Sequence, residues 1–111
     1  MEGIGKARIR IPETIRQGEL VEIKALIRHP METGLRKDKK SGAIIPAHFI
    51  TEVEVTFKDR PILTATWGPA IAQDPYMAFF LRADGPGVVK ITWKDNQGGV
   101  YSETANLTPK P

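Results

Sequence analysis

The feature that most constrains this chain is the alternation of apolar and polar residues along most of its length. In one segment Val53, Val55 and Phe57 alternate with Glu52 and Glu54, and other segments repeat the pattern. Successive side chains of a β-strand point to opposite faces, so each segment predicts a strand with one buried and one wetter face. No segment of any length shows the i, i+3, i+4 spacing of an amphipathic helix.

About seven such segments follow one another at short spacing, which predicts an all-β antiparallel sandwich. Turn residues separate them at residues 58–61, 84–87 and 95–99, and the last two stretches contain glycines suited to positive φ. A chain of 111 residues has room for one hydrophobic core. We therefore expect residues 1–111 to form a single domain.

Two stretches interrupt the alternation, at residues 29–46 and at residues 68–75. Loops as long as the first are uncommon in compact domains and are often functional. It contains a basic cluster, residues 36–40, followed by the apolar residues 43–47. Apolar residues beside charged ones suit a recognition surface. A solvated hairpin tip with apolar flanks accounts for the same residues equally well.

Composition excludes several classes of function. The chain has no cysteine, so it holds no disulfide, thiolate metal site or cysteine nucleophile. Its net charge of +3 is spread along the sequence, which does not favour nucleic-acid binding. No apolar run approaches the ~20 residues of a membrane span, and none near the N-terminus is long enough for a signal peptide. The sequence alone thus favours the cytoplasm.

Catalytic and metal sites are poorly supported. His29 and His48 are the two histidines, and neither Ser41 nor Ser102 lies in a nucleophile motif. An enzyme would need a pocket that brings the two histidines together. A metal would need them to converge with Asp38 or Met31, at a spacing that matches no ligand motif. We expect no enzyme, cofactor or metal, with His29 in a loop and His48 on the polar face of a strand.

The long loop carries a resemblance to a known family. His-Pro-Met-Glu-Thr-Gly-Leu-Arg-Lys-Asp at residues 29–38, continued by Ile-Pro-Ala-His-Phe-Ile at residues 45–50, resembles the SoxZ family of bacterial thiosulfate oxidation. The strand pattern extends the resemblance over nearly all of the chain. It implies an immunoglobulin-like β-sandwich.

The resemblance also implies a division of labour between two subunits. SoxZ proteins pair with SoxY, which carries sulfur intermediates on a cysteine near its C-terminus, and the missing cysteine of this chain agrees with that. The chain would stabilise SoxY and help to present the cargo to Sox pathway enzymes that dock transiently. The family acts in the periplasm, and we follow it over the cytoplasmic default because a folded chain without its own signal can be exported together with SoxY.

We expect the partner to contact an outer face or edge of the sandwich. Ile50, Ile62 and Phe80 are candidates because they lie opposite the main core stripes. The candidates in the loop are His29, Met31, Arg36, Lys37, Ile45 and His48. The basic cluster at residues 36–40 faces either a docking enzyme or the anionic cargo. The alternative function is an independent binding module that uses this cluster on a polyanion.

Overall fold

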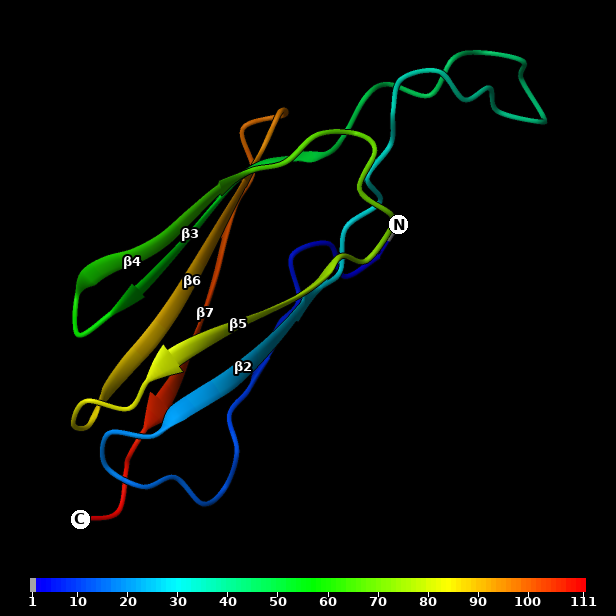
Figure 1. Ribbon diagram of the computed structural model, residues 1–111. Helices are drawn as coiled ribbons and strands as arrows, with labels where there is room; N and C mark the ends of the chain where they lie inside the picture. The colour runs from blue at the N-terminus through cyan, green and yellow to red at the C-terminus, as the bar shows by residue number, and fades with distance from the viewer. Residues whose placement is uncertain (1) are drawn as a thin grey trace.

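The computed structural model describes residues 2–111, and within them the chain forms seven β-strands and no helix (Figure 1). The strands are β1 (Ala7–Arg10), β2 (Leu20–Ile27), β3 (Ile50–Phe57), β4 (Arg60–Thr66), β5 (Tyr76–Arg82), β6 (Gly87–Asp95) and β7 (Val100–Leu107). Residues 2–111 accordingly contain no helix of the length and apolarity that a membrane crossing needs.

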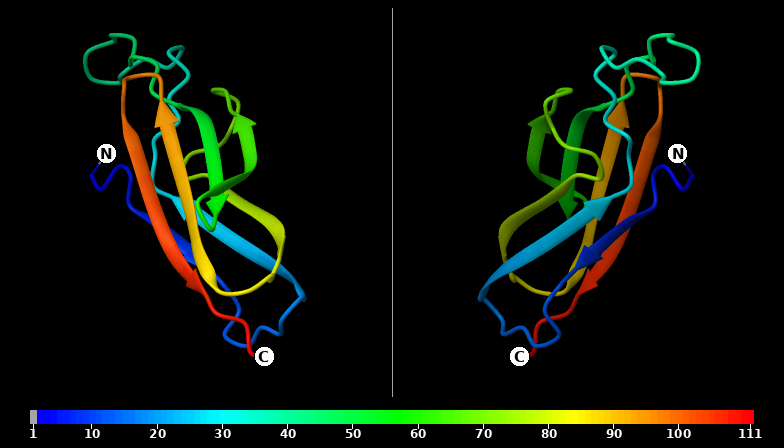
Figure 2. Two further views of the ribbon diagram at one scale, coloured as in Figure 1. Left: turned by 90° about the vertical axis from the view of Figure 1, so that its left-hand side faces the viewer. Right: turned by 90° about the vertical axis from the view of Figure 1, so that its right-hand side faces the viewer.

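The strands form two antiparallel sheets that pack face to face (Figure 2). One sheet has the order β1-β2-β5 and the other has the order β4-β3-β6-β7. The chain changes sheet after β2, after β4 and after β5, whereas β3–β4 and β6–β7 are hairpins within one sheet. This arrangement confirms the immunoglobulin-like β-sandwich.

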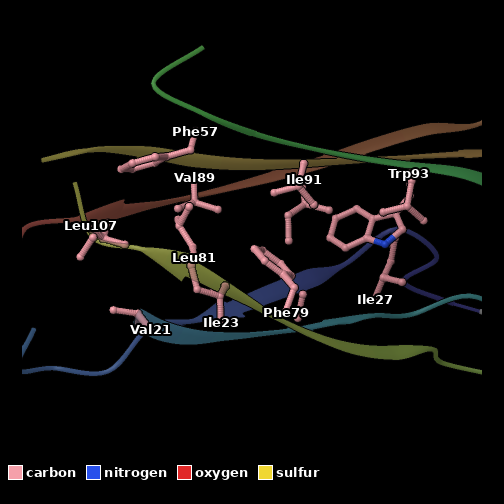
Figure 3. Close-up of a cluster of buried hydrophobic side chains, with 14 of the residues drawn as sticks. Val21, Ile23, Ile27, Phe57, Phe79, Leu81, Val89, Ile91, Trp93 and Leu107 are labelled. Atoms are coloured by element: carbon pink, nitrogen blue, oxygen red, sulfur yellow. The ribbon is translucent and has the colours of Figure 1, made fainter. Parts of the chain in front are cut away.

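The core lies between the sheets and is made mainly by the inward positions of β2, β3, β5 and β6 (Figure 3). The largest fully buried side chain is that of Trp93, which is 1% exposed and lies beside Ile27 and Ile91. The buried residues of these strands are Val21, Ile23, Ala25, Ile27, Ile50, Val53, Val55, Phe57, Phe79, Leu81, Val89, Ile91 and Trp93. Their burial removes apolar area from water, which is the main favourable term in folding.

Ile50 is part of this core, so its predicted place on an outer face is wrong. It is fully buried, as is Val53, although the two positions are three apart and simple alternation would put them on opposite faces. The pairing of β3 with β6 shifts register between Ile50 and Glu52. Such a bulge adds one residue to one strand and reverses the facing of everything before it. The simple alternation carried back from Val53 therefore assigns Ile50 to the wrong side.

The connection between β2 and β3 projects beyond the strand ends, and we call residues 32–48 the arm (Figure 1). Backbone hydrogen bonds join Glu32 to His48 in both directions, at 2.7 and 2.9 Å, and a second bridge joins Lys37 to Ile44. The arm is thus an irregular hairpin rather than a strand of either sheet. It lies at one end of a molecule with dimensions of 59 × 22 × 19 Å, and the C-terminus lies at the other end (Figure 2).

Candidate functional site

A buried carboxylate lies where the arm meets the sandwich. Asp95 is the last residue of β6 and is 7% exposed. Val89, Ile91 and Trp93 occupy the preceding inward positions of this strand, and alternation continues the inward face to Asp95. The carboxylate therefore points toward the chain that leaves β2 and enters β3.

Five hydrogen-bond donors surround the Asp95 carboxylate. Its Oδ2 accepts bonds from His29 Nε2 at 3.0 Å, from His48 Nε2 at 2.8 Å and from the Tyr101 hydroxyl at 2.7 Å. Its Oδ1 accepts the backbone N–H groups of Gln97 and Gly99 at 3.0 and 2.7 Å. A buried charge is tolerated when its lone pairs are satisfied in this way.

His29 is the most enclosed member of the cluster, with no exposed surface. The Met31 N–H donates to its Nδ1 at 3.2 Å, so that nitrogen is unprotonated and the proton of the neutral ring is on Nε2, facing Asp95. Burial lowers the pKa of His29, and the hydrogen bond to Asp95 opposes that change without reversing it. His29 is therefore held neutral.

The titration of the other two groups follows from the same contacts. Burial raises the pKa of Asp95, but hydrogen bonds from His29, Tyr101, Gly99 and His48 outweigh it and hold that pKa well below its usual range. Burial together with the bond to Asp95 raises the pKa of Tyr101 to about 12. Asp95 is an anion and Tyr101 a neutral donor across the ordinary pH range.

Two glycines leave room for this arrangement. A Cβ on Gly99 would meet the Tyr101 hydroxyl and would lie 2.6 Å from Asp95 Oδ2. A Cβ on Gly5 would meet the Tyr101 ring, and Gly5 also has a φ of +91°. Side chains at either position would displace Tyr101 from the carboxylate.

The hairpin that carries Asp95 also holds the returning strand of the arm. The Asn96 side chain accepts the N–H of Phe49 at 2.8 Å and donates to the Ala47 carbonyl at 2.9 Å. Gln97 Nε2 donates to the same carbonyl at 3.0 Å. An open cleft of about 470 Å³ lies beside this junction, and its lining includes Glu32, Arg36, Ile45 and His48.

The cluster contains atom types that bind metals, but its hydrogen bonds oppose a cation. His29, His48 and Asp95 offer two imidazole nitrogens and a carboxylate oxygen within 4.8 Å of one another. A metal bound at His29 Nε2 would require the proton on Nδ1, where the Met31 N–H already points. The donors are thus arranged around an anion rather than around a cation.

Several predicted contact residues are not available to a partner. His29 lies in the connection after β2, as predicted, but His29 and Met31 are only 0% and 5% exposed. His48 is half-buried, with 18% of its side chain exposed, and it belongs to the Asp95 cluster rather than to a polar strand face. The two histidine rings do meet, at 4.5 Å between centroids, and the carboxylate between them is Asp95 and not Asp38.

The other predicted residues lie on the surface. Arg36 and Lys37 are exposed on the arm, and the Arg36 guanidinium forms a two-bond ion pair with Glu32 at 2.8 and 3.0 Å. Ile45 is half-buried at the cleft. Ile62 and Phe80 are exposed on different sheets, Ile62 on the outer face of β4 and Phe80 on the outer face of β5.

The two outer faces differ in chemistry. On the β1-β2-β5 sheet, Leu26 pairs directly with Tyr76, and Leu20 lies diagonal to Phe80. These four apolar side chains are all exposed, and we call them the apolar face. On the β4-β3-β6-β7 sheet, the central outward pairs are Glu52 with Lys94, Glu54 with Thr92 and Thr56 with Lys90. Polar side chains are satisfied by water, whereas large apolar side chains exposed together on one face indicate an interaction site.

A comparison with protein-family models identifies the family. The model of the sulphur oxidation protein SoxZ matches residues 9–106. The chain belongs to the SoxZ family. Its role therefore lies in sulfur oxidation. The match confirms the resemblance of the loop at residues 29–50, and it spans every member of the Asp95 cluster as well as the apolar face.

Solved structures similar to this SoxZ-family chain share its fold at low sequence identity. A superoxide reductase (neelaredoxin) from Ignicoccus hospitalis is 16% identical, with a TM-score of 0.75 over 98% of this chain and 83% of that one. The sulfur carrier protein SoxY from Chlorobium limicola f thiosulfatophilum is 12% identical, with a TM-score of 0.67 over 95% and 79%. A search of curated proteins found no match.

Sequence reasoning missed the carboxylate of the SoxZ-family chain at the arm base. The turn pattern at residues 95–99 places Asp95 in a hairpin loop with Asn96 and Gln97, whereas the structure has it as the last residue of β6. The available signal was its inward position after Val89, Ile91 and Trp93. A carboxylate at the end of an inward row needs partners, and the donors come from residues 29, 48 and 101, which no local pattern joins.

Proposed function

We propose that this chain is the non-catalytic subunit of a two-chain sulfur carrier. SoxY binds the sulfur intermediates on its cysteine, and this chain stabilises SoxY and helps to present the cargo to the pathway enzymes. The absence of cysteine from the sequence supports this division. The proposal includes the periplasm as the compartment and export together with SoxY, as SoxZ family membership suggests.

The observation that carries the proposal is the apolar face. Leu20, Leu26, Tyr76 and Phe80 expose between 46% and 63% of their surface on the outward side of β2 and β5. They form two groups, Leu26 with Tyr76 and Leu20 with Phe80, with the Lys24–Ala78 pair between them. Burial of aromatic and aliphatic side chains by a partner would remove this area from water. We therefore assign the SoxY contact to the outer face of the β1-β2-β5 sheet.

The charges around the apolar face favour a different chain over a second copy. Arg8 lies in one cross-strand row with Leu26, and Arg10 lies in the next row with Lys24. The outward positions of this sheet and Arg28, the residue after β2, together carry five basic side chains and one carboxylate; they are Arg8, Arg10, Lys24, Arg28, Arg82 and Glu22. Two copies would bring like charges together, so the face fits a partner with acidic residues around an apolar patch.

The state of the histidines supports a subunit without catalysis of its own. A histidine base needs a nucleophile or substrate within hydrogen-bond reach. Nε2 of His29 and Nε2 of His48 instead both face the Asp95 carboxylate, and Nδ1 of His29 is bonded to Met31. These contacts describe a structural cluster.

The arm tip is proposed to dock the pathway enzymes. Lys37, Lys39 and Lys40 are exposed at the end of the arm, with the exposed apolar side chains of Leu35 and Ile44 nearby in the hairpin. Apolar groups beside lysines suit an acidic protein surface better than a small anion, which needs no apolar contact. The arm projects beyond the strand ends, whereas the apolar face lies on β2 and β5, so docking and pairing can occur together (Figure 1).

Co-expression with the SoxY of the same organism tests pairing. We expect the two chains to elute as one complex, and separate elution at micromolar concentration would refute the proposal. Phe80→Glu should weaken pairing about tenfold or more, because it places a charge at the most exposed side chain of the apolar face. Ile62→Glu is the matched control, since it puts the same charge on the other outer face.

Comparison of the two variants distinguishes between the two outer faces of the sandwich as the SoxY contact. If Ile62→Glu weakens the complex and Phe80→Glu does not, the contact lies on the β4-β3-β6-β7 face and the assignment is wrong. Heparin retention tests the alternative of a polyanion-binding module. A chain that fails to pair with SoxY, and that binds heparin with an affinity that falls steeply with salt, would favour that alternative.

A further inference from the structure

The arm is joined to the sandwich at one place, and Asp95 is at its centre. His29 lies where the chain leaves β2 toward the arm, and His48 lies where the arm returns to β3. Both imidazoles donate to the same oxygen of Asp95, on the β6–β7 hairpin. One carboxylate thus ties both strands of the arm base to the sandwich.

The geometry around His29 makes this tie sensitive to protons. Its Nε2–H binds Asp95 and its Nδ1 accepts the Met31 N–H, so both ring nitrogens are in use in the neutral form. A second proton on Nδ1 would point at the Met31 N–H and would break that bond. Met31 has a φ of +50°, an unfavourable conformation for a non-glycine residue, and it depends on local contacts to remain there.

We propose that Asp95 is the positioning residue of the arm, and that the hydrogen bonds running from Asp95 through neutral His29 to the Met31 N–H form a latch that fixes the arm at neutral pH and releases it in acid, when Nδ1 of His29 gains a proton. The inference concerns the chain alone and does not depend on pairing with SoxY. Asp95 acts on any docking partner through the direction in which the arm points, since it is buried at the end of β6 and not on the arm itself.

Other charged groups face the latch from every side. Asp74, in the connection before β5, accepts the backbone N–H of His29 at 3.0 Å. Tyr101 contributes a neutral hydroxyl from β7, and His48 faces His29 edge-on. On the arm, Glu32 is already paired with Arg36. The carboxylates Asp74 and Asp95 favour a charged His29, whereas burial and His48 disfavour it, and the balance lowers the pKa of His29.

The lowered pKa of His29 determines whether acid opens or closes the latch. A histidine whose pKa is lower in the closed latch than in the open one binds protons more readily when open. Acid therefore favours opening, beginning near the ordinary histidine pKa of about 6.5. The lowered pKa of Asp95 acts in the same direction, but only below the ordinary aspartate range near 4. Release in mild acid thus depends on His29.

Amide hydrogen exchange of the wild-type protein, followed by NMR, tests the latch. After correction for intrinsic exchange rates, protection of the Met31, Glu32, His48 and Gly99 amides should fall about tenfold between pH about 7.5 and pH about 5.5. Core amides of β3 and β6, such as Val55 and Ile91, provide the internal reference and should change much less. Side-chain nitrogen shifts of His29 should show the neutral Nε2–H form at the higher pH.

A conservative variant separates the two histidines. His48→Gln retains an N–H donor for Asp95 but removes the second imidazole, so we expect the acid-induced loss of protection to persist. Three results would overturn the proposal: protection of the arm base that follows the core amides at both pH values, loss of the acid effect in His48→Gln, or an Nδ1–H form of His29. Tight 1:1 binding of Zn²⁺ that protects the arm base would also overturn it, because the cluster would then be a metal site.

Discussion

The sandwich and the arm of this chain are stabilised in different ways. The sandwich is held by apolar side chains from both sheets, and no one of them carries the fold (Figure 3). The arm base depends on a few polar contacts, of which five converge on one carboxylate. Apolar burial distributes stability, whereas a hydrogen-bond cluster concentrates it.

The difference means that the two regions can respond to separate signals. Proteins open locally at free energies below that of global unfolding, in regions with few buried apolar contacts. The arm fits that description, since its tip is exposed and its base is polar. A change at the base can therefore redirect the arm while the sandwich stays folded, and the reverse cannot occur because the base is built on β6 and β7.

The largest expected effect is on the sandwich. Trp93→Ala would remove the largest fully buried side chain and should destabilise the chain by about 3–5 kcal/mol, through lost burial and a remaining cavity. Denaturant unfolding measures this loss. The arm base and the sheets should lose exchange protection together, because Asp95 follows Trp93 on the same strand. If the amides of the arm base lost protection while the unfolding midpoint stayed unchanged, Trp93 would stabilise the arm rather than the sandwich, contrary to the comparison of the two regions.

An intermediate effect is expected at the arm base. Tyr101→Phe would remove one donor from the buried Asp95 carboxylate while the ring keeps its contact with Gly5. The cost should be about 1–3 kcal/mol, appearing as faster exchange of the Met31 and His48 amides. Ser102→Ala, at the next, outward-facing position of β7, is the control and should leave these amides unchanged. Equal effects of the two variants would mean that Asp95 does not organise the base.

The smallest effect on stability is expected at the arm tip. Neutralising Lys37, Lys39 and Lys40 to Gln should change the unfolding free energy by less than about 0.5 kcal/mol, because all three are exposed. Stopped-flow association with a pathway enzyme should slow by on the order of tenfold at low salt, with SoxY pairing unaffected. Lys90, Lys94 and Lys110 lie outside the arm, so their substitution by Gln is the control that removes the same charge from the rest of the molecule. If association rates hold while pairing fails, the tip belongs to the SoxY contact instead.

Most of the sandwich could be predicted from the sequence because alternation is a local property. The inward rows of β2 and β6 follow directly from it, and Val21, Ile23, Val89 and Ile91 are buried as expected. Ile50 was misassigned because a bulge depends on the pairing of two strands, which one strand cannot reveal. Local patterns thus predict strands and faces but not interruptions in register.

The arm base could be predicted only in part. The length of the loop at residues 29–46 and its family resemblance indicate a candidate recognition surface. Its organising contact joins residue 29 to residue 95, and a hydrogen bond between such distant positions leaves no periodic signal. The zero exposure of His29 follows from that contact, so sequence reasoning described it as an ordinary loop residue.

The placement of the arm and the C-terminus at opposite ends has a practical consequence for handling the protein. A chain immobilised through Pro111 would present its arm to solution at the far end of a molecule 59 Å long. The other terminus offers no such freedom, since Gly5 bonds to the Arg28 carbonyl and packs against Tyr101. Tags and surface linkers attached at Pro111 would therefore keep clear of the arm, whereas those attached near residue 2 would crowd its base.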